Sequence, residues 1–314
     1  MRDDRQTSDT VLLVRPASFG FHAEAARSNL FSSASGDGDV RAAAIAEFEA
    51  LRGALEEAGV RCLVLEDDDE VVRPDAVFPN NWVSFHGDGT IITYPMTNVL
   101  RRLERRLPDL RELLLAGGFR VNAAIDLSPL EQAGAFLEGS GSLIFDRANA
   151  RAFACRSPRT SDAAVAAFAE VTGWDALLFD AADRDGRQIY HTNVMLILGS
   201  RFAILCSEAI APGDRNKLLE SIRASGRALI EVDFSQMERF ACNLIELRSA
   251  DGSPLIALST SALEALTPDQ RAALGRLGGR LVAVDIPTIE RVGGGSVRCM
   301  IADVHLPRSG GANG

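Results

Sequence analysis

The sequence predicts a single α/β domain, and two observations support this prediction. Short apolar runs of strand length recur throughout the 314 residues, and amphipathic stretches with apolar residues at helical spacing lie between them. Several strand-like runs come in adjacent pairs ahead of the next helix, which favours repeated units of two strands and a helix over a doubly wound sheet. No linker rich in proline, glycine and serine divides the chain, so residues 1–314 are expected to form one domain.

The expected strands are runs of Val, Ile, Leu and Phe, the residue types that favour a buried pleated sheet. They cover residues 10–14, 61–65, 90–94, 142–145, 152–155, 194–198, 202–206, 255–258 and 281–283. The expected helices repeat Ala and Leu at helical spacing, so that one face of each is apolar. They cover residues 40–58, 100–116, 161–172, 216–225 and 267–277.

The composition favours a soluble, acidic enzyme. Hydrophobic residues make up 46% of the chain, which is ample for a sizeable core, and the formal net charge is -10. Because nucleic acids and anionic membranes are negatively charged, this charge argues against either as the main partner. No apolar run reaches the roughly 18 residues of a membrane span. We therefore expect a cytoplasmic protein with a small-molecule partner, and we leave a homo-oligomer open.

The cysteines indicate free thiols. Cys62, Cys155, Cys206, Cys242 and Cys299 form an odd set without a CxxC pair or a histidine close by in sequence. This pattern predicts neither a disulfide framework nor a zinc site, so no metal is expected. There is no Walker motif and no complete dinucleotide-binding fingerprint, so no organic cofactor is expected.

One of these thiols is a candidate nucleophile. Three consecutive glycines, Gly293–Gly295, come shortly before Cys299, and glycine lets a substrate approach the backbone closely. A nearby cation such as Arg298 would favour the thiolate, which is the attacking form. The alternative is that Cys299 is a small buried hydrophobe beside Val297 and Met300.

Two further residues suit acid–base chemistry. His191 comes shortly before an apolar strand-like run, and it either moves protons there or is satisfied by local hydrogen bonds. Glu138 precedes a Gly-Ser-Gly turn, where it either orients an imidazolium or is solvated. A Glu, a His and a Cys in this order would form a set in which the acid orients the base and the base serves the nucleophile.

Neighbouring amides indicate a neutral polar ligand. Asn80 and Asn81 follow Pro79 and precede Trp82, and Asn193 lies two residues after His191. Amides donate and accept hydrogen bonds without adding charge. Pro-Asn-Asn is also ordinary turn chemistry, which is the alternative explanation.

Taken together, these motifs resemble the guanidine- and ureido-modifying superfamily with the pentein fold, which includes arginine deiminases, amidinotransferases and dimethylarginine dimethylaminohydrolases. The resemblance rests on residues 74–81, 137–139, 191–193 and 293–299. A closer similarity, to the citrulline-utilisation hydrolase branch, rests on residues 15–21, 78–86, 190–195 and 286–300.

The resemblance implies five ββαβ units around a pseudo-fivefold axis, a five-bladed α/β-propeller with the site at its centre. It also implies Cys299 as nucleophile, His191 as general acid and base, and Glu138 as the group that orients His191. Arg102 and Arg159 resemble positions that bind the substrate carboxylate, although Arg102 is almost as well explained as a solvated surface arginine.

The departures from the family pattern bear on the substrate. Asn81 and Asn193 stand where deiminases have aspartates that pair with a guanidinium. Burying a guanidinium without a countercharge is costly, whereas a neutral ureido group matches amide donors and acceptors. Asp75 remains acidic and would still meet a cation, which leaves a guanidino substrate open.

Three functions follow. The first is hydrolysis of the C–N bonds of a ureido amino acid such as citrulline, giving ornithine, carbon dioxide and ammonia. The second keeps the same residues with a guanidino substrate, as in a deiminase, a dihydrolase, a dimethylaminohydrolase or an amidinotransferase. The third is an inactive relative that binds an amino acid without chemistry.

Overall fold

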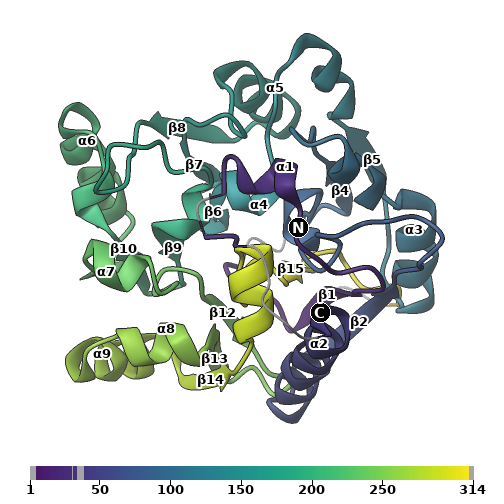
Figure 1. The fold of residues 1–314 in the computed structure, drawn as a ribbon. Helices are drawn as coiled ribbons and strands as arrows, with labels where there is room; N and C mark the ends of the chain where they lie inside the picture. The colour runs from purple at the N-terminus through teal and green to yellow at the C-terminus, as the bar shows by residue number, and fades with distance from the viewer. Residues whose placement is uncertain (1–4, 30, 34–38, 311–314) are drawn as a thin grey trace.

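The computed structural model describes residues 5–29, 31–33 and 39–310. These residues form five sheets of three strands each, set around a common axis with the long helices at the periphery (Figure 1). In every sheet the middle strand pairs antiparallel with the inner strand and parallel with the outer strand. The predicted five-bladed arrangement of ββαβ units is therefore confirmed.

The strands occupy equivalent places in the five sheets. The inner strands are β3 (Val83–Phe85), β6 (Ile144–Asp146), β9 (Leu196–Leu198), β12 (Ile245–Arg248) and β15 (Ala302–Asp303). The middle strands are β1 (Thr10–Arg15), β4 (Thr90–Thr93), β7 (Arg151–Cys155), β10 (Phe202–Leu205) and β13 (Pro254–Ser259). The outer strands are β2 (Arg61–Glu66), β5 (Ala123–Asp126), β8 (Asp175–Phe179), β11 (Ala228–Glu231) and β14 (Arg280–Val284).

Helices connect each middle strand to the outer strand of the same sheet, as parallel pairing requires. They are α2 (Val40–Glu57), α3 (Leu107–Ala116), α5 (Asp162–Thr172), α6 (Pro212–Ala224), α8 (Thr260–Ala265) and α9 (Pro268–Gly278). Shorter helices are α1 (Ala23–Ala26), α4 (Gly139–Ser142), α7 (Phe234–Met237) and a π-helix (Ile289–Gly293). Short 3-10 helices cover Pro79–Asn81, Leu100–Glu104, Ser128–Ala133, Arg147–Asn149, Thr192–Val194 and Ser207–Ala209. No helix within the described ranges is both long and apolar enough to span a bilayer.

Helix α2 illustrates how the periphery is attached. Asp39 caps its first turn through a side-chain hydrogen bond, which satisfies a free backbone N–H. Phe48 and Leu51 lie on one face of the helix and belong to the same buried cluster as Val11 and Leu13 of β1. This face covers the sheet, and β1 carries apolar residues on both of its faces because both are buried.

Both ends of the described chain contribute to one sheet. Strand β15 pairs with β1, with Val11 opposite Asp303 and Leu12 opposite Ala302. This pairing closes the ring of blades and places the turn before β15, which contains Cys299, beside the axis.

Several strands and boundaries differ from the sequence-based predictions. Strands β3, β5, β8, β11, β12 and β15 were not predicted. Strand β5 is mostly exposed and β15 is only two residues long, so neither produces a strong apolar pattern. The helix expected over residues 100–116 is divided before Pro108, and Ser142 belongs to α4 instead of a strand.

Candidate active site

Turns before the inner strands carry the polar residues that meet near the axis. Asn81 ends the 3-10 helix before β3, Glu138 precedes α4 and β6, and His191 precedes the 3-10 helix before β9. Asn243 and Cys299 occupy the corresponding turns before β12 and β15. The fold thus delivers one or more functional groups from each blade.

His191 and Glu138, which the sequence predicts as an acid–base pair, lie in contact. His191 Nε2 lies 2.9 Å from Glu138 Oε2, and the two side chains are 3% and 0% exposed. Because a carboxylate only accepts hydrogen bonds, Nε2 carries the proton and Nδ1 is the basic nitrogen of the neutral ring. Burial lowers the pKa of His191 to about 4, although Glu138 opposes this shift. The ring is therefore neutral at neutral pH, with Nδ1 available to accept a proton.

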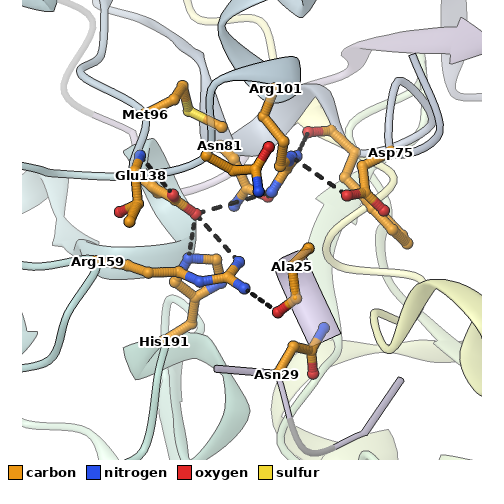
Figure 2. A network of polar contacts seen from close by, with 12 residues as sticks. Ala25, Asn29, Asp75, Asn81, Met96, Arg101, Glu138, Arg159 and His191 are labelled. Carbon is orange, nitrogen blue, oxygen red and sulfur yellow. Dashed lines mark hydrogen bonds and ion pairs between the residues drawn. The ribbon is translucent and has the colours of Figure 1, made fainter. Parts of the chain in front are cut away.

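Glu138 is held as a carboxylate. Burial alone would raise its pKa, but Arg159, His191 and Arg101 outweigh burial and lower it well below the usual range. Its Oε2 lies 3.3 Å from Arg159 and 3.7 Å from Arg101, as Figure 2 shows. Its Oε1 accepts from the backbone N–H of Thr97. A charged Glu138 therefore fixes the tautomer and the orientation of His191.

Cys299 is surrounded by amide donors. The thiol is 5% exposed, and its sulfur lies 3.4 Å from Asn193 Nδ2 and 3.2 Å from Asn243 Nδ2. Sequence reasoning named Asn193 but missed Asn243, which follows Cys242 in a segment without a distinctive motif. Amide N–H groups directed at a sulfur favour its thiolate form.

Asn81 lies against a buried arginine. Its Oδ1 accepts from Arg101 Nη1 at 2.9 Å, and Arg101 also forms a bidentate ion pair with Glu104 at 2.9 and 3.0 Å. Arg101 Nε lies 3.8 Å from Asp75, whose carboxylate is also 2.7 Å from His22 Nδ1. The pKa of Arg101 is raised because these carboxylates outweigh its burial.

Several buried polar atoms near the sulfur and the turn before β3 have no hydrogen-bond partner among the described residues. They are Asn81 Nδ2, Asn193 Oδ1 and both amide atoms of Asn80. Asn81 is oriented without ambiguity, because the arginine beside its oxygen can only donate. Asn81 thus has an unpaired donor and Asn193 an unpaired acceptor, and a buried polar atom without a partner is costly.

The glycines before Cys299 allow side chains of the protein to approach closely. A Cβ on Gly293 or Gly295 would lie 2.7 or 2.9 Å from the ring of Phe78. Gly294 has a φ of +65°, and a Cβ there would lie 2.5 Å from Asn29 Nδ2. The same glycines line a small cavity of about 20 Å³ with Cys299.

A family model described as N,N dimethylarginine dimethylhydrolase, eukaryotic, matches residues 15–306. The chain belongs to this family. This family consists of hydrolases with the pentein fold. No curated protein sequence matches the chain significantly.

Solved structures share the fold of this dimethylarginine dimethylhydrolase family member. The arginine dihydrolase ArgZ from the ornithine–ammonia cycle in cyanobacteria has a TM-score of 0.74 and 16% identity, covering 95% of this chain and 41% of its own. AgrE, in a complex with ornithine and NAD+, has a TM-score of 0.73 and 16% identity, covering 95% and 39%. The chain thus spans less than half of these two proteins.

A third structure is similar over nearly its full length. It is the dimethylarginine dimethylaminohydrolase (DDAH) from Pseudomonas aeruginosa, as a Cys→Ser variant complexed with citrulline. Its TM-score is 0.66 at 16% identity, and the match covers 94% of this chain and 99% of that one. At this identity the likeness concerns the fold.

Of the residues predicted to bind substrate, Asp75, Asn81 and Arg159 line the cavity, whereas Asn80, Asn193 and Arg102 do not. Arg102 is held outside it. Its Nε lies 3.1 Å from Glu131 and donates to the carbonyl of Met96. Its neighbour Arg101 points inward and lines the cavity with Arg159. A 3-10 helix at Leu100–Glu104 sets this direction, and the sequence does not reveal which of two adjacent arginines it turns inward.

Arg298 also points away from the nucleophile. Its Nη1 donates to the carbonyl of Ile301 at 2.8 Å, and its Nη2 lies 3.5 Å from Asp303. The sequence left open whether Arg298 faces Cys299, and the structure places amide groups at the sulfur instead. Arg159 remains beside the site, but it already donates to Glu138, to Ser28 and to the carbonyl of Ala25.

Replacing Gly141 with alanine tests how closely the site is packed. An added Cβ would overlap Asn81 Nδ2 and lie 2.9 Å from His191 Nδ1. We expect Gly141→Ala to lower kcat by about 100-fold, since small displacements of catalytic groups have effects of this size. Steady-state kinetics and a thermal unfolding curve measure the effect. Gly53→Ala in helix α2, where nothing lies within 4 Å of the new Cβ, should leave kcat unchanged; an equal loss in both variants would contradict the prediction.

Acidification should destabilise the protein through His191. The unfolded histidine binds a proton below its ordinary pKa of 6.5, whereas burial delays protonation of the folded one until about pH 4. The unfolded state therefore binds more protons in this window, and stability falls as the pH falls through it. Between pH 7 and about 4.5 we expect the parent to lose about 2 kcal/mol more than His191→Asn in urea unfolding. If the free energy of unfolding fell equally in the parent and in His191→Asn, the imidazole of His191 would not be buried in its neutral form.

Proposed function

We propose that this protein hydrolyses the C–N bonds of a ureido amino acid, most simply citrulline, to ornithine, carbon dioxide and ammonia. The observation that carries the proposal is the pair of unpaired amide atoms, the donor Asn81 Nδ2 and the acceptor Asn193 Oδ1. A ureido group has a carbonyl oxygen that accepts and N–H groups that donate, so it would satisfy both atoms. A guanidinium has donors alone and would leave the Asn81 donor unpaired.

Charge supports the same substrate. The guanidinium of Arg101 already lies against Asn81 Oδ1, so a second cation at Asn81 would meet a buried like charge. A neutral ureido group avoids this repulsion. The cavity is lined by two arginines and by Asp75, which suit the carboxylate and the ammonium group of an amino acid. Arg101 takes the place that sequence analysis gave to Arg102.

In the proposed reaction, the Cys299 proton passes to His191 Nδ1 and the thiolate attacks the ureido carbon. One C–N bond breaks, and His191 returns the proton to the departing nitrogen. The remaining thiocarbamate on sulfur is then hydrolysed by water that His191 deprotonates, which restores the thiol and releases a carbamate. The carbamate decomposes to carbon dioxide and an amine, so one water is consumed for each citrulline.

A guanidino substrate is the second candidate, because the family model is that of dimethylarginine hydrolysis and because Asp75 and Glu138 are carboxylates near the cavity. To distinguish the two, purified protein is given L-citrulline or L-arginine separately, and ornithine, citrulline and ammonia are measured. Ornithine from citrulline supports the ureido proposal. Citrulline that accumulates from arginine, with citrulline itself inert, contradicts it. Binding without any product would indicate the inactive relative.

Replacing Asn81 with aspartate removes the unpaired donor and adds a negative charge. We expect kcat/KM for citrulline to fall by about 100-fold, since removing a hydrogen-bond partner of the substrate strongly lowers the catalytic efficiency of a site that depends on it. The same kinetic assay measures this effect. Asn216→Asp in helix α6 makes the same chemical change on the periphery and should have no effect. Unchanged citrulline kinetics in Asn81→Asp would mean that this amide does not select the substrate.

A further inference from the structure

Asn243 is buried against the Cys299 sulfur. It precedes β12, in the sheet for which the sequence predicted no site residue. The side chain is 1% exposed, and Nδ2 lies 3.2 Å from Cys299 Sγ and 3.4 Å from the carbonyl of Asn193. The distances place the amide between the two turns that carry the nucleophile and its other amide partner.

The orientation of this amide is determined by the backbone. Asn243 Oδ1 accepts from the backbone N–H of Arg298 at 3.1 Å, which fixes the orientation of the amide. The Cys299 thiol can also donate to Oδ1 at 3.6 Å, but Nδ2 is the closer amide atom to the sulfur, at 3.2 Å. Since Arg298 directly precedes Cys299, one side chain holds both the backbone of the nucleophile turn and its sulfur.

The turn that presents Asn243 is itself unusual. Phe240 has a φ of +62°, a left-handed conformation that is strained for a residue with a large side chain. The carbonyl of Phe240 accepts from the backbone N–H of Asn243 at 2.7 Å, which closes the turn. Such strain persists where the surroundings enforce it, and here it brings the amide to the sulfur.

No cationic side chain is hydrogen-bonded to the sulfur within the described part of the chain. Arg298 turns toward Asp303, and His191, which lines the same cavity as Cys299, is neutral at neutral pH because burial lowers its pKa. A cationic substrate would itself favour the thiolate, but a ureido substrate does not. Stabilisation of the thiolate therefore depends on dipoles, and the amides of Asn193 and Asn243 supply the side-chain donors.

We propose that Asn243 is a catalytic residue whose amide N–H stabilises the Cys299 thiolate and aims it at the substrate carbon. When the thiol loses its proton to His191 Nδ1, the hydrogen bond from Nδ2 becomes charge-assisted and strengthens. The need for a dipolar donor rests on the proposed ureido substrate, but the effect on the thiol exists without substrate.

The test uses alkylation of Cys299 by iodoacetamide as a function of pH, followed by mass spectrometry of the Cys299 peptide, in the absence of substrate. Asn243→Asp keeps the shape and the oxygen that accepts from Arg298, but it replaces the donor with an acceptor. We expect the midpoint of its alkylation profile to move up by about one pH unit or more, because losing one hydrogen bond to a charged group has a free energy of about this size. With citrulline we expect kcat to fall by about tenfold or more with little change in KM.

Two comparisons make the result specific. Cys62 in the same digest is an internal reference and should show one profile in every variant, and Asn149→Ala on the exposed turn before β7 should behave as the parent. Asn243→Ala, a smaller residue without a side-chain donor, replaces Asn243→Asp as the test if the latter fails to fold, and its midpoint should also rise. Coincident Cys299 profiles for the parent and the folded variant would overturn the proposal. If the Cys299 profile of the variant is shifted but the parent protein does not turn over citrulline, the role of Asn243 is upheld and only the proposed substrate is contradicted.

Discussion

We expect Cys299→Ala to abolish turnover, with a loss of about a thousandfold or more, because the proposed reaction has no other group to form the covalent intermediate. The sulfur lies beside a cavity and the side chain is small, so the fold should persist. Ammonia and ornithine release measure turnover, and calorimetric titration with citrulline measures binding. Mass spectrometry of parent protein quenched during turnover should detect an adduct on the Cys299 peptide that the variant lacks.

A second cysteine serves as the matched control. Cys62 lies on outer strand β2, and burial raises the pKa of its thiol to about 12, so it is not a nucleophile at neutral pH. Cys62→Ala should retain the kinetics of the parent. Normal turnover by Cys299→Ala would rule out covalent catalysis by this residue, whatever the substrate.

The sequence predicted the middle strands well and the outer strands poorly, for a physical reason. A middle strand such as β10 is buried on both faces and appears as a continuous apolar run. An outer strand such as β11 has two exposed residues of four, so its pattern does not stand out from a loop. Strand β3 has three residues and β15 has two, which is too short for a strand pattern, and β15 is defined by pairing with β1 from the other end of the chain, which is not a local property of the sequence.

The residues of the site also divide into those with a local sequence pattern and those without one. Glu138, His191 and Asn81 lie in local motifs with glycine, proline or paired amides; His191 and Asn81 line the same cavity as Cys299, and Glu138 lies 2.9 Å from His191. Arg101 could not be separated from Arg102, because the direction of each side chain depends on a tight 3-10 helix. Asn243 has no local signal, and its position becomes evident only from the distance to a residue 56 positions away.

The second large effect concerns Glu138, whose carboxylate contacts His191 and two buried arginines. We expect Glu138→Gln to lower the free energy of unfolding by about 3 kcal/mol, because Arg101 and Arg159 would lose a buried carboxylate that lies 3.7 and 3.3 Å from them. Glutamine keeps the shape, so the loss reports charge and not a cavity. The neutral amide can also donate to His191 Nε2, which would place the proton on Nδ1 and remove the base.

This change of tautomer separates a catalytic effect from a structural one. The expected loss in kcat is about a thousandfold or more even at low temperature, where the variant remains folded, because disturbing the orienting acid has effects of this order in comparable triads. Urea unfolding and kinetics on the same preparation measure the two effects independently. Glu66→Gln on strand β2, where the side chain is 67% exposed and 3.9 Å from Arg15, should change stability by less than about 0.5 kcal/mol. If Glu138 only neutralised the arginines, Glu138→Gln would be less stable but would keep a nearly normal kcat. This outcome would contradict the assignment of Glu138 as the group that orients the base.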